Sequence, residues 1–219
     1  MLSLDDYYLS REDRVQKAAS VHPLYAQRGV PGTHDLDALL ADIDALVAGE
    51  QQRALPLFDK STDDRNPEAR HIDLTEPAGL LIVEGWCIGA LPQTDSELAA
   101  SINDIEARDD PDGSFRRRVN RATARYRQAL ATRLDAFWYL RPPAWQQVLE
   151  WRWQQECDLP SDRRRLRDPA DVAAFLALFQ RLSEHMQQLT APGANAWADL
   201  IIPLDDLHRP QLETAHEPA

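Results

Sequence analysis

Short apolar runs alternate with amphipathic stretches along this chain, and two of the runs end abruptly in acidic residues. Residues 1–4 lead into Asp5, and residues 79–83 lead into Glu84. A continuous apolar run of this kind is typical of a parallel strand that is covered on both faces. We therefore predict buried strands at both places. Weaker patterns predict further short strands at residues 55–58, 136–140 and 200–204.

Helices are predicted between these runs. Residues 36–47 carry leucine, isoleucine and valine at helical spacing, with Asp35 placed to cap the start and Gly49 to end the helix. Further helices are predicted over residues 10–20, 95–107 and 115–134, from Pro142 to about Cys157, and from Pro169 to Leu182. Strands that alternate with helices predict an α/β fold with a parallel sheet and right-handed crossovers.

The length of 219 residues suits one domain with a small lid. We assign the domain to residues 1–204, with the lid at about residues 142–168. The polar residues 205–219 form a C-terminal tail that we expect to be loosely held.

The charge balance excludes several classes of partner. A net charge of −12 opposes long-range attraction to nucleic acid. No apolar run approaches the roughly 18 residues that a membrane span requires, and the acidic first residues carry no signal-peptide pattern. Cys87 and Cys157 have no metal-ligand spacing, and we expect a reduced, cytoplasmic protein. From the charge and the short apolar runs we expect neither a nucleic-acid nor a membrane partner. The oligomeric state is not readable from the sequence.

Two acids follow the strongest apolar runs, where a parallel sheet places its ligand-binding edge. In phosphoryl transfer the protein mainly positions groups and stabilises charge, and an acid such as Glu84 can hold Mg²⁺. Gly85 would let a ligand approach the backbone, and Asp5 could accept the proton of an attacking hydroxyl group. The alternatives are a strand that ends at a polar turn and an acid that caps a helix.

Two polar segments offer positive charge for a small anionic substrate. The first runs from Arg28 to His34 and contains two glycines and a proline, which fix a specific backbone path. The second, residues 58–65, carries Lys60, one of only two lysines in the chain, and Arg65. An ordinary connecting loop and a solvated turn are the alternative interpretations.

Arg152 lies on the helix predicted after residues 136–140. An arginine on a mobile element could reach a transferring phosphoryl group, where its charge matters greatly. The alternative is a surface ion pair with Glu156, four residues further along the same helix.

The order of these motifs resembles the D-glycerate 3-kinases, which are relatives of uridine kinase, pantothenate kinase and phosphoribulokinase among the P-loop kinases. The matching stretches include residues 2–9, 28–35, 57–65, 83–89 and 148–156. The strings Gly-Val-Pro-Gly-Thr-His-Asp and Phe-Asp-Lys-Ser-Thr-Asp-Asp-Arg are specific to this group. The resemblance covers nearly all of residues 1–204.

The resemblance implies a P-loop kinase fold with helices on both faces of the sheet, and ATP-dependent phosphorylation of a small hydroxy acid such as D-glycerate. ATP and Mg²⁺ are the implied cofactors. Asp5 matches the acid that activates the acceptor hydroxyl, Glu84 the acid near Mg²⁺, and Arg152 a lid arginine. The implied substrate contacts are Arg28, His34, Lys60 and Arg65.

The sequence departs from the family at one place. Members carry a strand and a Gly-x-x-x-x-Gly-Lys-[Ser/Thr] phosphate loop ahead of the first matching stretch, whereas this sequence contains no Gly-Lys pair. That first strand is central in the family's sheet, so its loss would leave unpaired edges. Two hypotheses remain open: an N-terminally truncated kinase that is inactive as written, or a non-catalytic kinase remnant that binds a partner or metabolite. An acidic interaction module unrelated to kinases is the third and weakest reading.

Overall fold

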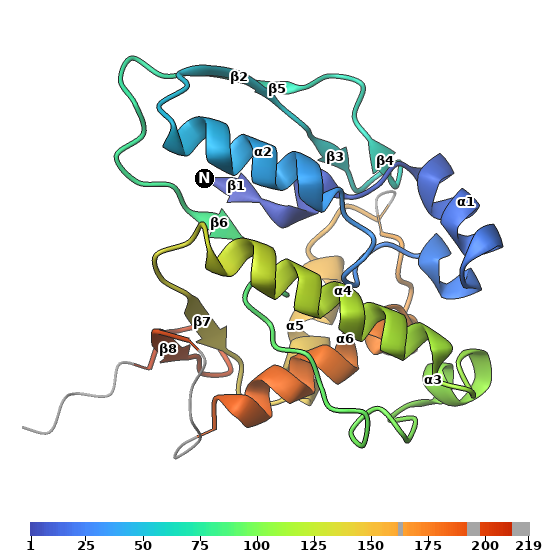
Figure 1. Ribbon diagram of the computed structural model, residues 1–219. Helices are drawn as coiled ribbons and strands as arrows, with labels where there is room; N and C mark the ends of the chain where they lie inside the picture. The colour runs from blue at the N-terminus through green and yellow to red at the C-terminus, as the bar shows by residue number, and fades with distance from the viewer. Residues whose placement is uncertain (162–163, 192–197, 212–219) are drawn as a thin grey trace, which may run out of the picture. The chain divides into compact units, whose positions relative to one another are not determined.

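The computed structural model describes residues 1–161, 164–191 and 198–211, in which groups of helices and groups of short strands follow one another along the chain (Figure 1). The chain divides into two compact units, Met1–Asp135 and Ala136–Ala219. The predicted α/β architecture with parallel strands is confirmed. The assignment of residues 1–204 to one kinase-like domain stays a prediction.

The centre of the first unit is a parallel ladder between β1 (Leu2–Ser3) and β6 (Val83–Glu84). Leu2 pairs with Val83, and Ser3 pairs with Glu84. The prediction of a buried strand over residues 79–83 is wrong in extent and in burial, because the side chains of Leu80 and Ile82 are 78% and 51% exposed. Within the described residues β6 consists only of Val83 and Glu84, and β1 is its one ladder partner.

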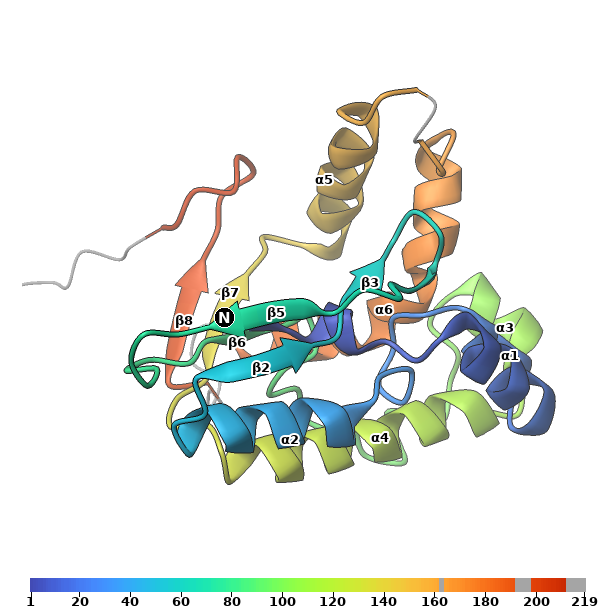
Figure 2. The same cartoon turned by 90° about the horizontal axis from the view of Figure 1, so that it is seen from above.

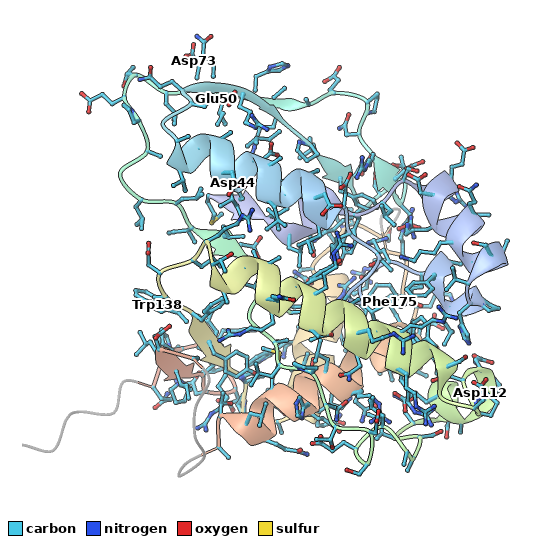
Figure 3. The ribbon with its side chains drawn as sticks, viewed as in Figure 1. Asp44, Glu50, Asp73, Asp112, Trp138 and Phe175 are labelled. Carbon is cyan, nitrogen blue, oxygen red and sulfur yellow. The ribbon has the colours of Figure 1, made fainter. Side chains whose placement is uncertain are left out.

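The first unit also contains α-helices and short 3₁₀ helices. They are η1 (Leu4–Tyr7), α1 (Arg11–Ser20), η2 (Pro23–Ala26), α2 (Leu36–Val47), α3 (Asp104–Asp109) and α4 (Ser114–Ala131). The Asp35 side chain accepts a hydrogen bond from the N–H of Ala38, so the predicted cap of α2 is present. α2 lies beside α4, where Asp44 accepts two hydrogen bonds from Arg133 (Figure 3).

Two antiparallel ribbons follow α2, and the sequence pattern did not predict them. β2 (Gln52–Leu55) pairs with β5 (Arg70–Asp73), and β3 (Phe58–Asp59) pairs with β4 (Asp64–Arg65). Figure 2 shows β2 running along α2, to which Arg53 is tied by a 2.5 Å hydrogen bond to Asp42. The single strand predicted at residues 55–58 is wrong, because Leu55 ends β2 and Phe58 begins β3, and the two strands belong to different ribbons.

The helix predicted at residues 95–107 is also wrong. Only Asp104–Asp109 are α-helical there, and residues 94–97 form a turn in which Glu97 accepts hydrogen bonds from Thr94. The following helix α4 begins after Gly113, whose φ of +73° favours glycine. Asp110 is buried below that start and accepts hydrogen bonds from the N–H groups of Phe115 and Arg116.

The second unit contains the parallel pair β7 (Trp138–Arg141) and β8 (Leu200–Pro203), together with α5 (Trp145–Cys157) and α6 (Pro169–Leu189), which pack against each other. The strand predicted at residues 136–140 lies one to two residues further along. Hydrogen bonds hold residues 206–211 of the predicted tail, since Asp205 accepts from Arg209 and Gln211. Its remainder lies outside the described residues. No described helix is both long and apolar enough to cross a membrane.

Candidate active site

Asp5 and Glu84 leave the same edge of the β1–β6 ladder. Ser3 and Glu84 are register partners in parallel strands, and Asp5 follows Ser3 by two residues in η1. Carboxyl ends of parallel strands are the places where α/β folds bind their ligands. The arrangement therefore supplies two carboxylates at one sheet edge.

Gly85 follows Glu84 and has a packing reason of its own. A Cβ atom at this position would lie 2.7 Å from the Cβ of Leu4 and 3.1 Å from Cγ1 of Ile88. The absent side chain thus lets η1 approach the turn after β6. The predicted approach of a ligand to this backbone stays a prediction.

Lys60 and Asp5, both predicted site residues, are paired with each other. The Nζ atom of Lys60 donates a 2.7 Å hydrogen bond to Oδ2 of Asp5. Lys60 lies in the turn after β3, and Asp59 shapes that turn by accepting hydrogen bonds from the N–H and hydroxyl of Ser61. Those bonds also hold the pKa of Asp59 below its ordinary value, with the Ser61 hydroxyl as the largest cause.

The loop from Arg28 to Asp35 is fixed by internal hydrogen bonds and by its neighbours. The Thr33 hydroxyl donates to the carbonyl of Val30 and accepts from the N–H of Gly29. Lys17 donates to the Gly32 carbonyl at 2.6 Å, and Trp86 donates its indole N–H to the Gly29 carbonyl at 3.0 Å. The loop therefore presents a defined backbone beside the turn that follows β6.

His34 is carried by that loop to the end of η1. Its ring stacks on Tyr8 with 4.3 Å between centroids, and Nδ1 lies 3.2 Å from the hydroxyl of Tyr126. Burial lowers the pKa of His34 to about 3, against an opposing effect of Asp5, so the ring is neutral at physiological pH. Its Nε2 atom is buried and has no hydrogen-bond partner among the described residues.

Arg28 and Arg65 are already engaged by other parts of the first unit. Arg28 is ion-paired with Asp63, which also pairs with the buried Arg14. Arg65 donates from Nε to the carbonyl of Tyr8 at 2.8 Å and pairs with Asp35 at 3.2 Å. Both guanidinium groups therefore connect separate segments of the first unit. Their predicted contacts with substrate stay predictions.

Three residues beside Asp5 and His34 were missed by sequence reasoning. Tyr8, Cys87 and Tyr126 are buried or nearly so, and burial raises the pKa of each. The Asp5 carboxylate raises the pKa of Tyr8 and Cys87 further. Tyr8 and Cys87 stand next to the two acidic motifs, and that adjacency is the signal that could have drawn attention to them.

The described residues offer a limited fit for the implied cofactors. They hold no group of three or more His, Cys, Asp or Glu side chains arranged for a metal ion. Glu84 is an exposed carboxylate without a hydrogen bond or ion pair within the described part of the chain. One free carboxylate is compatible with Mg²⁺, which proteins often bind through one or two carboxylates plus phosphate oxygens and water. No phosphate loop for ATP is present in the sequence.

Arg152 lies on α5 in the second unit. It forms the ion pair with Glu156 that is the alternative to a contact with a phosphoryl group. One of its terminal nitrogens lies 2.8 Å from Oε2 of Glu156, and the other donates to Gln155. Glu156 is buried, and its other oxygen accepts from the N–H groups of Arg165 and Leu166. These groups lower the pKa of Glu156, outweighing the opposite effect of its burial. A phosphoryl contact by Arg152 stays a prediction, and the predicted lid includes residues 162–163, which lie outside the described residues.

Comparisons with known proteins identify kinases as relatives. No family model matches the chain. The uncharacterized kinase mug58 of Schizosaccharomyces pombe is 31% identical over 182 residues, which is 80% of this chain and 65% of mug58. The probable ATP-dependent kinase TDA10 of Saccharomyces cerevisiae is 33% identical over 101 residues, which is 41% of this chain and 34% of TDA10. The chain thus matches less than two thirds of the length of either relative.

Solved structures give the same fold. A D-glycerate 3-kinase from Cryptococcus neoformans has a TM-score of 0.75 and 25% identity, with 95% of this chain and 77% of that chain covered. The YGR205w protein has a TM-score of 0.67 and 24% identity, with 95% and 74% covered. The second likeness shows the fold alone. The first likeness gives this chain the fold of a D-glycerate 3-kinase.

Proposed function

We propose that this chain, which has the fold of the P-loop kinases and resembles the D-glycerate 3-kinases, carries the acceptor side of an ATP-dependent phosphotransferase. The observation that supports this most is the pairing of Ser3 with Glu84, which brings Asp5 and Glu84 to one sheet edge. The acceptor in this proposal is an alcohol group of a small hydroxy acid such as D-glycerate. The location is cytoplasmic, with neither nucleic acid nor a membrane as partner.

Asp5 is the general base in this proposal. Its carboxylate takes the proton of the acceptor hydroxyl as the hydroxyl oxygen attacks the phosphoryl group, a role typically worth about 10²- to 10⁴-fold in rate. Lys60, which pairs with Asp5, supplies positive charge for the carboxylate of the hydroxy-acid substrate. His34 is the proposed neutral contact for the substrate's polar end. Its unpaired Nε2 atom is buried, so this contact requires neighbouring side chains to move when substrate binds.

ATP is the proposed phosphoryl donor, and Glu84 and Gly85 lie on its side of the site. Mg²⁺, when bound, neutralises charge on the phosphates, and Glu84 would hold it. Arg152 is the proposed lid arginine. A phosphate loop is not among the 219 residues, so we propose that this chain by itself does not transfer phosphate from ATP at a normal rate.

An ATP-consumption assay on the 219-residue chain with D-glycerate tests that statement, and robust turnover would contradict it. The coding DNA upstream of Met1 is then read in frame for a phosphate-loop motif within about 50 codons, a span set by the size of a βα unit. A longer protein with that motif should phosphorylate D-glycerate, detected by ³¹P NMR. Failure with every hydroxy acid offered would refute the proposed substrate class.

The alternative is a non-catalytic kinase remnant that acts as a binding protein. It is favoured by the lack of any Gly-Lys pair in the sequence. An in-frame stop codon shortly upstream of Met1, together with D-glycerate binding but no turnover, would support this alternative over the truncated kinase.

A further inference from the structure

Lys60 differs from the other cations predicted to bind substrate. Arg28 is 15% exposed and ion-paired with Asp63, and Arg65 is bound to the Tyr8 carbonyl and to Asp35. The Lys60 side chain is 61% exposed, and its one hydrogen-bond partner within the described residues is Asp5. Lys60 can therefore leave its partner without breaking the contacts that connect segments of the first unit.

We propose that Lys60 exchanges one carboxylate partner for another when substrate binds. In the empty site it pairs with Asp5, and in the loaded site it pairs with the carboxylate of the incoming hydroxy acid. The exchange frees Asp5 to accept the proton of the acceptor hydroxyl. This inference rests on the proposed function, because it takes Asp5 as the base and an acid as the substrate.

The energetics allow this exchange. The Lys60 side chain is 61% exposed and the Asp5 side chain 29% exposed, so water and salt screen the ion pair and its contribution is small. The ammonium group of lysine sits on a flexible four-carbon stem and has no fixed fork geometry to lose. A second carboxylate at the same place can therefore compete for Lys60 on nearly equal terms.

The exchange also gives the site a preference for acids. A neutral polyol has no group that replaces the Asp5 carboxylate on Lys60, so the base stays occupied when a polyol enters. A hydroxy acid removes the lysine from the base by the same contact that binds the acid. Lys60 would thus both favour acidic substrates and determine when Asp5 can accept a proton.

The exchange predicts that loss of a site residue increases affinity: removing the carboxylate of Asp5 should tighten the binding of D-glycerate. Affinity is measured by NMR titration of D-glycerate into the 219-residue chain and its Asp5→Asn, Lys60→Met and double variants. We expect Asp5→Asn to bind about twofold to fivefold more tightly than the unmodified chain, the range that an exposed ion pair allows. Lys60→Met should bind more weakly, and Asp5→Asn should give no gain when combined with it.

A control separates exchange from simple charge repulsion. Asp6→Asn removes the same charge one position along the chain, from a carboxylate that accepts the N–H of Phe58, and should not reproduce the Lys60-dependent gain. Titration with glycerol should not distinguish Asp5→Asn from the unmodified chain. Far-UV circular dichroism checks that each variant is folded.

The possible results separate a failure of the exchange from a failure of the proposed function. A gain from Asp5→Asn that persists in the Lys60→Met background means plain repulsion, which overturns the exchange and leaves the proposed function standing. No detectable binding of D-glycerate or other hydroxy acids to the unmodified chain overturns the proposed substrate class and the exchange together.

Discussion

Ser3 of β1 and Glu84 of β6 are direct partners in a parallel ladder, although 80 residues separate them in the sequence. Parallel strands put their carboxyl ends at the same edge of a sheet. Asp5, two residues after Ser3, and Glu84 therefore leave that edge together. The proposed acceptor site depends on this relationship more than on any single side chain.

Asp5→Asn should abolish phosphoryl transfer in a form of the protein that carries a phosphate loop. The amide keeps the size of the carboxylate but cannot accept the hydroxyl proton, so we expect a loss of about 10²- to 10⁴-fold in kcat. Steady-state kinetics with D-glycerate measures the effect. ATP binding, followed by fluorescence or calorimetry, should be largely unchanged, and its loss would argue against the role of base.

Gly85→Ala should destabilise the first unit. A Cβ atom there would lie 2.7 Å from the Cβ of Leu4 in η1, and overpacking of this kind costs about 1–3 kcal/mol. Urea unfolding measures the difference. Gly79→Ala is the matched control, since a Cβ at Gly79 meets nothing within 4 Å. Equal stability of the two variants would show that η1 does not pack closely on the turn after β6.

Most helices were predictable because their signals are local. The start of α2 follows from Asp35 and the start of α6 from Asp168, whose side chain accepts the N–H of Asp171. The extent of β6 was not predictable, because it depends on how far a partner strand runs. The ribbons of β2 with β5 and of β3 with β4 were missed for a related reason: their residues are polar, and distant pairing holds them together.

The site was predictable as a set of residues but not as a set of contacts. The motif strings named Asp5, Lys60 and Arg28. Only the folded chain separates the exposed Lys60 from Arg28, because the Asp63 that engages Arg28 lies 35 residues away in sequence. Arg116 illustrates the same limit. It stands in a run of three arginines, a pattern typical of a solvated surface, yet its side chain is buried against Asp110 and the carbonyl of Leu98.

Arg14→Met should loosen the first unit strongly. Arg14 is fully buried, and it donates hydrogen bonds to the carbonyls of Leu9, Ala26 and Asp63 while pairing with the Asp63 carboxylate. Methionine leaves those acceptors unpaired, at a cost of about 3 kcal/mol or more in the free energy of unfolding. Arg11→Met, an exposed position on the same helix, should change it by less than about 0.5 kcal/mol. Similar unfolding midpoints for the two would contradict the bracing role of Arg14.

His34 should make the stability of the first unit fall on acidification. Its pKa is lowered from an ordinary value of 6.5 to about 3, mainly by burial. Between these pH values the unfolded chain binds a proton at this residue and the folded chain does not. The free energy of unfolding therefore decreases as pH falls, by up to about 1.4 kcal/mol per pH unit from this residue.

Urea unfolding at a series of pH values from about 7 to about 5 measures that slope. His34→Asn should flatten it, even though loss of the stack on Tyr8 lowers stability at every pH. His71→Asn, on the exposed strand β5, is the control and should keep the slope of the unmodified chain. An unchanged slope in His34→Asn would mean that folding does not lower the pKa of His34, so that the folded and unfolded chains take up its proton over the same pH range. Burial would then not keep the His34 ring neutral, and the neutral role proposed for His34 in substrate binding would lose its support.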